Sequence, residues 1–555
     1  MKLVLSKKRS VLVLALAGAF LALLTTACPQ ECTDCGTGGG SGGGSGGGTA
    51  TGGGTGTGGN LGTGGGTTGT ITVTGHVTYD FVPETYSVGG TAVLDFARAT
   101  QRPVRRGVVQ VIQGTTILSA TATGGDGSFS ISYTPAGSGQ LLLYALSQSV
   151  EPSISVKDNT DNNLLWAVGS MISGRNETVN LHAAHGWNGT AYDNAARAAA
   201  PFAILDSMFT ASRAFMAARP SVAFPPLGVN WSPHNVPQSG DKTQGLIGTS
   251  HFAPAENQIY VLGKEGADTD EFDSHVIVHE WGHFFEANLS RSDSPGGRHG
   301  PGDILDPRIA FGEAWGNSVA AMVLPETMYI DTNWNGASMS GFGFDAETEP
   351  NPSDDPTPSG FSESSVLRVL YDVFDGNNES FDNFGVGLGP ITDVLTGPQK
   401  STDAMTTLAS FVTALKAQPG VNGSALDTLL AHSQIGPITT VFGDGDPGLR
   451  GMYTDAALPY SATMALGGGN PANSWEQNQY YVFTGTGQTV TVSATSPEDV
   501  AVTAFRKGVK VGAADANTSG TESFTFSSQQ GVTYVMVLTG FGATAGNYDI
   551  DVSIH

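Results

Sequence analysis

A glycine tract near the N-terminus decides which part of this chain can fold. From Gly36 to Thr70, 21 of 35 residues are glycine, and nearly all the others are serine or threonine. Such a segment has too few apolar side chains to form a core, and as a flexible coil it spans roughly 30 to 35 Å on average. Because the chain has 555 residues in all, we expect a stalk followed by several domains.

The residues before the tract have the pattern of an export signal. Basic residues between Lys2 and Arg9 precede an uncharged apolar run over residues 11–24, and small residues follow it. This run of 14 residues is shorter than the roughly 20 that a membrane-spanning helix needs. Residues 1–27 are therefore predicted to be a signal peptide that is removed on export.

The end of this signal, from Leu24 to Cys28, resembles a bacterial lipobox, with Thr25 where leucine is usual. The resemblance implies cleavage before Cys28 and attachment of a lipid to that residue. Residues 28–70 would then tether the folded part to the bacterial outer membrane or cell surface. The alternative is ordinary cleavage after Ala27, which would give a soluble secreted protein.

The three cysteines are Cys28, Cys32 and Cys35, all before the glycine tract. The residues from Ile71 onward therefore fold without disulfides or thiolate metal ligands. A redox role for the Cys32-x-x-Cys35 pair would need a βαβ context, which a glycine tract does not provide. We expect a terminal disulfide there, or no function at all.

The charge balance excludes one class of partner. Lysine and arginine number 25 against 50 aspartate and glutamate residues, so the net charge is −25. A protein that binds nucleic acid neutralises phosphates with clustered basic residues, and an acidic chain repels a polyanion instead. We expect no nucleic acid partner, and we expect the chain to act as a monomer.

Two regions with alternating apolar and polar residues flank the middle of the chain. Residues 71–184 contain short runs such as Gly107-Val108-Val109-Gln110-Val111, and their pattern resembles the carboxypeptidase regulatory-like (transthyretin-like) β-sandwich, which implies a non-catalytic module. Residues 461–555 alternate in the same way. There, Gln479 to Phe483 together with Gly546 to Tyr548 resemble the bacterial pre-peptidase C-terminal domain, a β-sandwich often appended to secreted peptidases.

Residues 185–460, between the two sandwiches, change to the helical period. Apolar residues line one face from Pro201 to Ala218, and Pro- and Gly-rich segments such as 351–360 interrupt the pattern as loops. Further helices are predicted at Phe272 to Leu289, Arg308 to Val323, Ser362 to Phe374 and Asp403 to Leu415. The predicted fold class is multidomain, with an α+β domain between two all-β sandwiches.

The segment His279-Glu280-Trp281-Gly282-His283 carries the sharpest chemical signal. Residues four apart lie on the same face of a helix, so His279 and His283 can bind one Zn²⁺ together. Glu280 lies beside them and can act as general base toward a water at the metal. The segment therefore predicts a zinc site on a helix.

A catalytic zinc site needs a third protein ligand and one open position. A metzincin would have a histidine six residues after His283, but Leu289 stands there. The segment Phe311-Gly312-Glu313-Ala314-Trp315 offers Glu313 on a second helix instead. This arrangement resembles the gluzincins, and its long spacing is similar to that of the fungalysin branch. The resemblance implies a zincin-like metallopeptidase domain with Glu313 as the third zinc ligand.

Two further features bear on this resemblance. Many gluzincins place an aspartate four residues after the ligand glutamate, where it binds a ligand histidine, and Asn317 stands there in this chain. An asparagine carbonyl accepts the imidazole N–H but, being neutral, raises the basicity of the ligand less. A strand is predicted from Asn257 to Gly263. It is either the edge along which a peptide lies, as in gluzincins, or an ordinary strand of a sheet.

Other residues near the motif have simpler interpretations. His251, His275, His299 and Tyr371 are candidates by position alone for stabilising an oxyanion, and none is chosen. Tyr371 is predicted to pack in the core, and His275 to be a surface or packed residue. His299 lies in a Gly-rich loop and is predicted to face solvent.

Two acidic clusters are candidates for Ca²⁺ binding through carboxylate oxygens. One consists of Asp268, Asp270, Glu271 and Asp273, and the other is Asp444-Gly445-Asp446. Neither has the spacing of an EF-hand. The alternative interpretation is solvated loop charge and helix capping.

Together these features predict an exported, membrane-anchored zinc endopeptidase that acts on a protein or peptide substrate. Zn²⁺ is the expected cofactor, held by His279, His283 and Glu313 with Glu280 as base, and Ca²⁺ is a second candidate. One alternative is a surface adhesion or glycan-binding lipoprotein with an inactive zincin scaffold, although a structural zinc site would need no Glu280. Another is a zinc hydrolase of a non-peptide bond, which would share every residue of the site.

Overall fold

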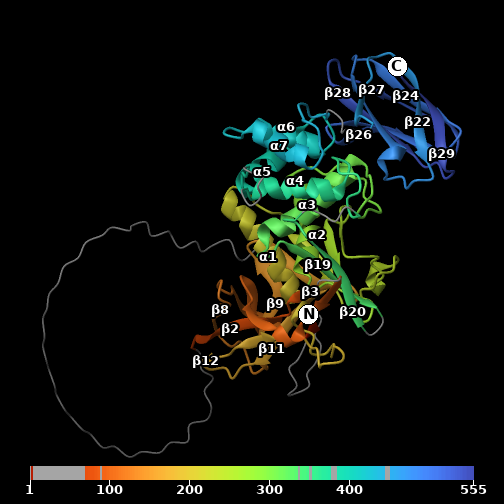
Figure 1. The fold of residues 1–555 in the computed structure, drawn as a ribbon. Coiled ribbons are helices and arrows are strands. Elements are labelled where there is room, and N and C mark those ends of the chain that lie inside the picture. Colours follow the sequence, from red (N-terminus) through yellow and green to blue (C-terminus); the bar gives the residue numbers. More distant parts are fainter. Residues whose placement is uncertain are drawn as a thin grey trace, which may run out of the picture.

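The computed structural model describes residues 2–3, 69–87, 90–335, 338–348, 353–376, 384–443 and 450–555. The predicted signal peptide apart from residues 2 and 3, the three cysteines, the stalk as far as residue 68 and the Asp444 to Asp446 cluster lie outside the described residues. The protein is multidomain: β-rich parts lie at its two ends, and most of the helices lie between them (Figure 1). No helix among the described residues combines the length and the hydrophobicity needed to cross a bilayer.

The first β-rich part contains two packed sheets and a separate two-stranded sheet. Its elements are β2 (Ile71–Phe81), β3 (Glu84–Ser87), β4 (Thr91–Leu94), the short 3₁₀ helix η1 (Phe96–Arg98), β5 (Thr100–Pro103), β6 (Gly107–Gln113), β7 (Thr116–Ala122), β8 (Ser128–Tyr133), β9 (Leu141–Val150), β10 (Ser153–Asp158), β11 (Leu164–Met171), β12 (Glu177–Thr178) and β13 (Leu181–Ala183). In the smaller sheet, β5, β8, β12 and β13 all pair with β2. Apolar side chains of both sheets, among them Val73, Val109 and Leu143, form the core between them.

The larger sheet continues past residues 184 and 185, where the sequence predicts a domain boundary. It gains β14 (Leu227–Trp231), β15 (His251–Ala253) and β16 (Gln258–Val261), and β1 (Lys2–Leu3) lies beside β11. The strand order is β15-β16-β14-β10-β11-β9-β6-β7. β10 and β14 run parallel, with Ile154 opposite Leu227. One sheet therefore links the first β-rich part to the helical part.

The strand predicted from Asn257 to Gly263 lies inside this sheet and not at its edge. β16 pairs with β14 on one side and with β15 on the other. The edge strand is β15, in which Phe252 lies opposite Ile259. The interpretation of residues 257–263 as a substrate-binding edge is therefore wrong, because the edge of this sheet is formed by residues 251–253. A strand of three residues is too short to produce a period-two pattern.

The helices of the middle part pack around one apolar core. They are α1 (Ala200–Ala218), the 3₁₀ helix η2 (Lys242–Gln244), α2 (Ser274–Leu289), α3 (Pro307–Val323), α4 (Glu363–Phe374), α5 (Leu388–Val394), the π-helix η3 (Leu395–Gln399), α6 (Leu408–Lys416) and α7 (Gly423–His432). Buried aromatic rings join α2 to its neighbours. Phe215 of α1 lies 5.3 Å from Trp281, and Phe285 lies 5.6 Å from Trp315 of α3, measured between ring centroids. The helix with the His-Glu-x-x-His motif is thus fixed on both sides.

Most of the predicted helices are confirmed to within two residues at each end. The exception is the helix predicted to begin at Asp403, which begins at Leu408. Thr407 and Ser410 form a capping box that sets this start. The residues before it bind the loop after α2 instead. The helices α5 and α7 were not predicted from the sequence.

A four-stranded sheet packs against the start of α2. It consists of β17 (Gly263–Lys264), β18 (Asp268–Thr269), β19 (Met328–Asn335) and β20 (Ser338–Asp345), in that order. The backbone N–H of Thr332 in β19 donates to the carboxylate of Asp273 at 2.7 Å. Asp273 is the residue directly before α2, so this bond joins the sheet to the helix.

The second β-rich part is a sandwich of two sheets. Its elements are β21 (Tyr453–Asp455), β22 (Tyr460–Gly468), the 3₁₀ helix η4 (Trp475–Gln477), β23 (Asn478–Thr484), β24 (Thr489–Ser496), β25 (Val500–Arg506), β26 (Val509–Ala514), β27 (Gly520–Ser527), β28 (Thr533–Gly540) and β29 (Gly546–Ile554). One sheet has the order β21-β23-β28-β25-β26 and the other the order β22-β29-β24-β27. Val492, Val502 and Ile550 lie fully buried between them.

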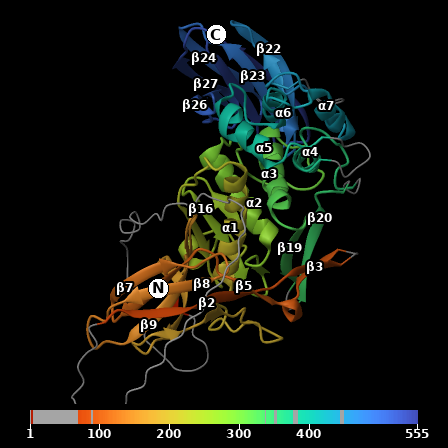
Figure 2. The same cartoon turned by 90° about the vertical axis from the view of Figure 1, so that its left-hand side faces the viewer.

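This second sandwich is docked on the start of α3, at the end of the molecule opposite the first β-rich part (Figure 2). The backbone N–H of Trp475 donates to the carbonyl of Ile304 at 2.9 Å. The hydroxyl of Tyr480 donates to Asp306, whose carboxylate also caps α3 by accepting from the N–H of Arg308 at 3.0 Å. Trp475 and Tyr480 are buried in the same core as α2 and α3. The start of α3 is therefore fixed by the C-terminal sandwich.

Candidate metal centre

Two glycines let the helices α2 and α3 approach each other closely. A Cβ at Gly316 of α3 would lie 2.7 Å from the ring of His279, and a Cβ at Gly282 of α2 would lie 2.8 Å from the side chain of Val319. A side chain at either position would push the helices apart. Glu313 precedes Gly316 by about one helical turn, so its carboxylate also faces α2.

The donor atoms of His279, His283 and Glu313 converge on one point. The two Nε2 atoms lie 3.0 Å apart, and each lies 3.3 Å from Oε2 of Glu313. Donors about 2.0 to 2.1 Å from one tetrahedral zinc ion are separated by roughly 3.3 Å. Two imidazole nitrogens and one carboxylate oxygen also form a donor set that zinc prefers. The residues therefore fit a zinc ion, and the structure brings together all three predicted ligands.

A chain of polar contacts orients His279. Its Nδ1 lies 2.7 Å from Oδ1 of Asn317, an acceptor, so Nδ1 carries the proton and Nε2 keeps its lone pair for a metal. The side-chain amide of Asn317 then donates to Oε1 of Glu363 at 2.7 Å. Glu363 is the first residue of α4. A carboxylate therefore stands behind Asn317, one residue further from His279.

His299 is exposed, as predicted, and it also belongs to the same network. Its Nδ1 lies 2.9 Å from Oε2 of Glu363, and its Nε2 lies 3.3 Å from Oε2 of Glu313. Burial alone would lower the pKa of His299, but the hydrogen bond with Glu363 and the charge of Glu313 outweigh it and raise that pKa to about 9. His299 is not one of the three residues whose donor atoms all lie within 4.8 Å of one another. It is therefore a neighbour of the three donors and not one of them.

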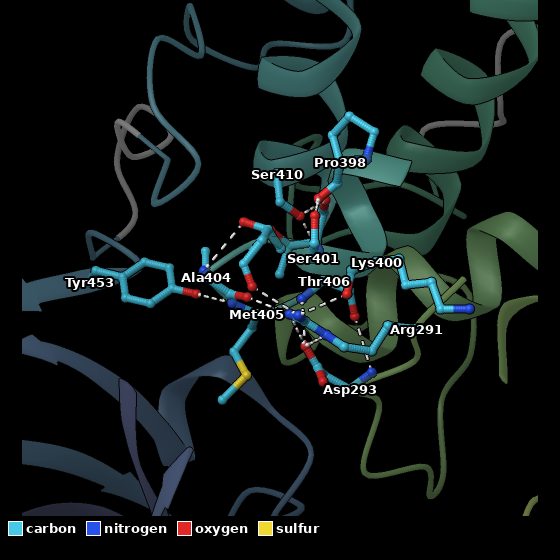
Figure 3. A network of polar contacts seen from close by, with 12 residues as sticks. Arg291, Asp293, Pro398, Lys400, Ser401, Ala404, Met405, Thr406, Ser410 and Tyr453 are labelled. Carbon is cyan, nitrogen blue, oxygen red and sulfur yellow. Dashed lines mark hydrogen bonds and ion pairs between the residues drawn. The ribbon is translucent and has the colours of Figure 1, made fainter. Parts of the chain in front are cut away.

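The loop that carries His299 is anchored at its start by Arg291 and Asp293 (Figure 3). The guanidinium of Arg291 donates to the carbonyl of Thr402 at 2.8 Å and binds Asp293 at 2.8 Å. Asp293 in turn accepts from the N–H of Thr406 at 2.8 Å. These bonds fix the chain directly after α2 against the segment before α6, and the loop returns from there to α3 and α4.

Glu280 is held by the edge strand of the large sheet. The backbone N–H of Phe252 in β15 donates to Oε2 of Glu280 at 2.7 Å. Glu280 is 8% exposed, so its carboxylate is screened from most water. The bond fixes the side chain next to His279 without removing its capacity to accept a proton.

Two other candidate residues, His275 and Tyr371, are packed inside the protein. His275 is buried one turn before His279, and its Nε2 donates to the carbonyl of Glu326 at 2.9 Å, as expected for a packed residue. Since a carbonyl only accepts, Nε2 carries the proton. Tyr371 is buried near Phe374, as predicted. Tyr329, which the sequence does not single out, packs with its ring 6.3 Å from that of His279.

The acidic residues before α2 separate into two groups. Glu271 accepts from Arg197 at 3.1 Å, and Asp273 accepts from Thr332, so both have protein partners. Asp268 and Asp270 instead lie with Asp331 of β19, and one oxygen of each carboxylate is within 4.8 Å of the others. Burial is the main cause that raises the pKa of all three carboxyls, that of Asp331 to about 7.

Sequence comparisons give no family for this chain. No family model matches it, and no curated protein matches it. Among solved structures, the pre-peptidase C-terminal domain of a Bacillus anthracis collagenase is similar over 20% of this chain and 100% of its own length, with 12% identity and a TM-score of 0.16. A surface-associated copper-binding protein of Methylomicrobium album is similar over 19% of this chain and 98% of its own, with 11% identity and a TM-score of 0.14. The periplasmic lysozyme inhibitor PliG of Salmonella Typhimurium is similar over 18% of this chain and 98% of its own length, with 12% identity and a TM-score of 0.13.

Proposed function

We propose that this chain is an exported zinc-dependent endopeptidase, anchored to the bacterial membrane through a lipid on Cys28. The observation that carries the proposal is the convergence of His279, His283 and Glu313 at 3.0 to 3.3 Å beside Glu280. Three protein donors with a fourth position left open are typical of a catalytic zinc site. The carboxylate of Glu280 is the group that a purely structural site would not need.

The roles of the residues follow from their contacts. Zinc, when bound, would supply a Lewis acid that lowers the pKa of water and polarises a carbonyl. Glu280, fixed by the N–H of Phe252, takes the proton of the attacking water and passes it to the leaving amine. His299 lies at the rim beside Glu313 and is 32% exposed, so it can reach a bound substrate. As a cation it would stabilise negative charge on the substrate oxygen.

The edge strand β15 offers a way to hold the peptide backbone. In a β-strand, the N–H and C=O of one residue point to the same side. The N–H of Phe252 points away from β16 toward Glu280, so the carbonyl of Phe252 also points away from β16. A peptide that donates an N–H to this carbonyl would lie along β15 next to Glu280, which brings a scissile bond to the catalytic base.

The test is cleavage of an unfolded protein, such as reduced casein, by the zinc-loaded chain and by its Glu280→Gln variant. We expect cleavage to fall by on the order of 10² to 10⁴-fold in the variant, with bound zinc unchanged because Glu280 is not a ligand. Glu326→Gln, an exposed glutamate after α3, is the matched control and should cleave normally. Equal cleavage by the chain and by Glu280→Gln would contradict the mechanism.

The same experiment separates the alternatives that share the site. Bound zinc with no turnover of any protein, ester or glycan substrate would indicate a scaffold with a structural zinc ion. Turnover of a non-peptide substrate alone, lost in Glu280→Gln, would keep the catalytic residues and change the substrate class.

A further inference from the structure

A second group of side chains can hold a metal ion, and it lies outside the zinc centre. Asp268 belongs to β18, Asp270 follows that strand, and Asp331 belongs to β19. Asp268 lies opposite Asn333 in the antiparallel pair of these strands. Because residues two apart share a face of a strand, Asp331 lies on the same face as Asn333, and Asp270 continues the face of Asp268. The fold therefore gathers three carboxylates on one side.

One of these carboxylates has a buried oxygen that no donor reaches. Asp270 is 3% exposed, and its Oδ2 accepts from the hydroxyl of Ser250. Its Oδ1 is buried and has no hydrogen-bond partner. Burying an ionised carboxylate oxygen without a partner is costly, so buried charges are normally paired or bind metals. One oxygen of this carboxylate lies within 4.8 Å of an oxygen of Asp268 and of an oxygen of Asp331.

The charge of this group is also not balanced by protein. Among the described residues, no lysine, arginine or histidine forms an ion pair with Asp268, Asp270 or Asp331. The nearby cation Arg197 is bound to Glu271 instead. Three carboxylates with oxygens within 4.8 Å of one another repel each other in a partly buried position. A bound cation would remove both the repulsion and the unpaired oxygen.

We propose that Asp268, Asp270 and Asp331 form a Ca²⁺ site separate from the zinc centre. All the side-chain donors are oxygen atoms, which hard cations prefer and zinc does not. Ca²⁺ accepts irregular geometry with monodentate or bidentate carboxylates, backbone carbonyls and water, so three carboxylates at this spacing can provide the protein part of its shell. Mg²⁺ demands a stricter octahedron and is the weaker fit.

The site would join two segments that bear on the zinc centre. Asp270 lies four residues before α2, and Asp331 lies two residues after Tyr329, whose ring packs against His279. A cation between them would cross-link β19 to the chain that enters α2. The expected effect is therefore on stability. It does not depend on the proposed peptidase activity, since none of the three carboxylates belongs to the zinc centre.

The test is calcium binding by the whole chain with its zinc centre filled. Calcium is removed by a chelating resin, Zn²⁺ is restored, and ⁴⁵Ca²⁺ is added by equilibrium dialysis. We expect about one Ca²⁺ per chain and a higher Tm when CaCl₂ is present. Asp331→Asn and Asp270→Asn should each lose the bound calcium and the calcium-dependent rise in Tm. Asp515→Asn, an exposed residue of the second sandwich, should keep both.

The variants also show whether the fold survives. Replacing one of three repelling carboxylates by an amide should raise Tm in the absence of calcium, so a variant that melts higher without calcium and does not respond to it supports the site. Absence of bound calcium in the unchanged chain would overturn the proposal, and so would calcium binding that persists in Asp331→Asn.

Discussion

Two clusters of side chains that could hold a metal ion lie on or beside α2, and they differ in almost every physical respect. His279, His283 and Glu313 combine nitrogen with oxygen, come from two helices and are oriented by Asn317. Asp268, Asp270 and Asp331 offer oxygen only and come from strands and a loop. Helices pinned by aromatic packing fix donors at tetrahedral spacing, which a small borderline ion needs. Short strands place carboxylates less exactly, which a hard ion with flexible geometry accepts.

The comparison teaches that satisfied partners distinguish the two sites as much as the donors do. Every contact that orients His279 continues to another residue, through Asn317 to Glu363 and on to His299. The Asp270 carboxylate ends in an oxygen without a partner. The continuous network behind His279 holds that side chain in one orientation. This unpaired oxygen is the observation that supports the proposed Ca²⁺ site.

The largest effect should come from breaking the zinc centre. His283→Ala removes one of three ligands, so we expect loss of stoichiometric zinc and of essentially all proteolysis, because a site with two protein ligands binds zinc weakly. Metal analysis after dialysis and a casein assay measure both. Calcium binding should be unchanged in this variant, and its loss would show that the two clusters form a single site.

The next largest effect should be on the pH dependence of stability, and it comes from His275, the histidine of α2 outside the group of three donors. Burial lowers the pKa of His275 to about 4, even though its hydrogen bond to the carbonyl of Glu326 acts in the opposite direction. The unfolded chain, with a histidine pKa of about 6.5, takes up this proton first. The stability contribution is thus fully present above about pH 6.5 and is lost as pH falls toward 4.

The loss amounts to at most about 3 kcal/mol from His275. We expect the zinc-loaded chain to lose stability between pH 6.5 and 4 more steeply than His275→Gln does, as measured by urea unfolding at a series of pH values. The same slope in both proteins would mean that acid acts through the metal centres and not through this residue.

A smaller effect should follow from changing the carboxylate behind Asn317. Glu363→Gln leaves the three ligands in place but removes a negative charge. That charge polarises the amide of Asn317, whose oxygen accepts from His279. Zinc affinity is expected to fall by roughly 10 to 100-fold, as measured by competition with a chromophoric chelator. Adding Asn317→Asp to this variant should restore affinity, because it places a carboxylate directly against His279. An unchanged affinity in Glu363→Gln would limit the residue to a packing role.

The sequence reveals those parts of the fold that depend on short-range spacing. The helices α2 and α3 follow from their apolar periods, and the convergence of His279, His283 and Glu313 follows from the motif and the gluzincin resemblance. The strands of the second sandwich from Gln479 onward follow from strict alternation. For the helices and strands the signal lies within about ten residues, which is the range over which their periods act. Glu313 stands further along the chain and follows from the resemblance alone.

The parts that the sequence does not reveal depend on contacts between distant residues. Glu363 is an ordinary first-turn glutamate of α4, and only the packing of α4 against α3 brings it to Asn317. His299 lies in a Gly-rich loop whose path is set by the bonds of Arg291 and Asp293 to residues more than 100 positions away. Asp331 lies in β19, a strand absent from the predictions, so the Asp268 and Asp270 pair had no visible third member.

The docking of the second sandwich sets the order in which the centre can be completed during synthesis. A chain made from its N-terminus contains all three zinc donors once Glu313 has been added. The helix that carries Glu313 begins at a cap on Asp306, and the hydroxyl that holds this cap belongs to Tyr480, 174 residues later. A nascent chain therefore carries the donors long before it carries the residue that fixes their second helix. The contact that fixes the start of α3 therefore forms only when most of the chain exists.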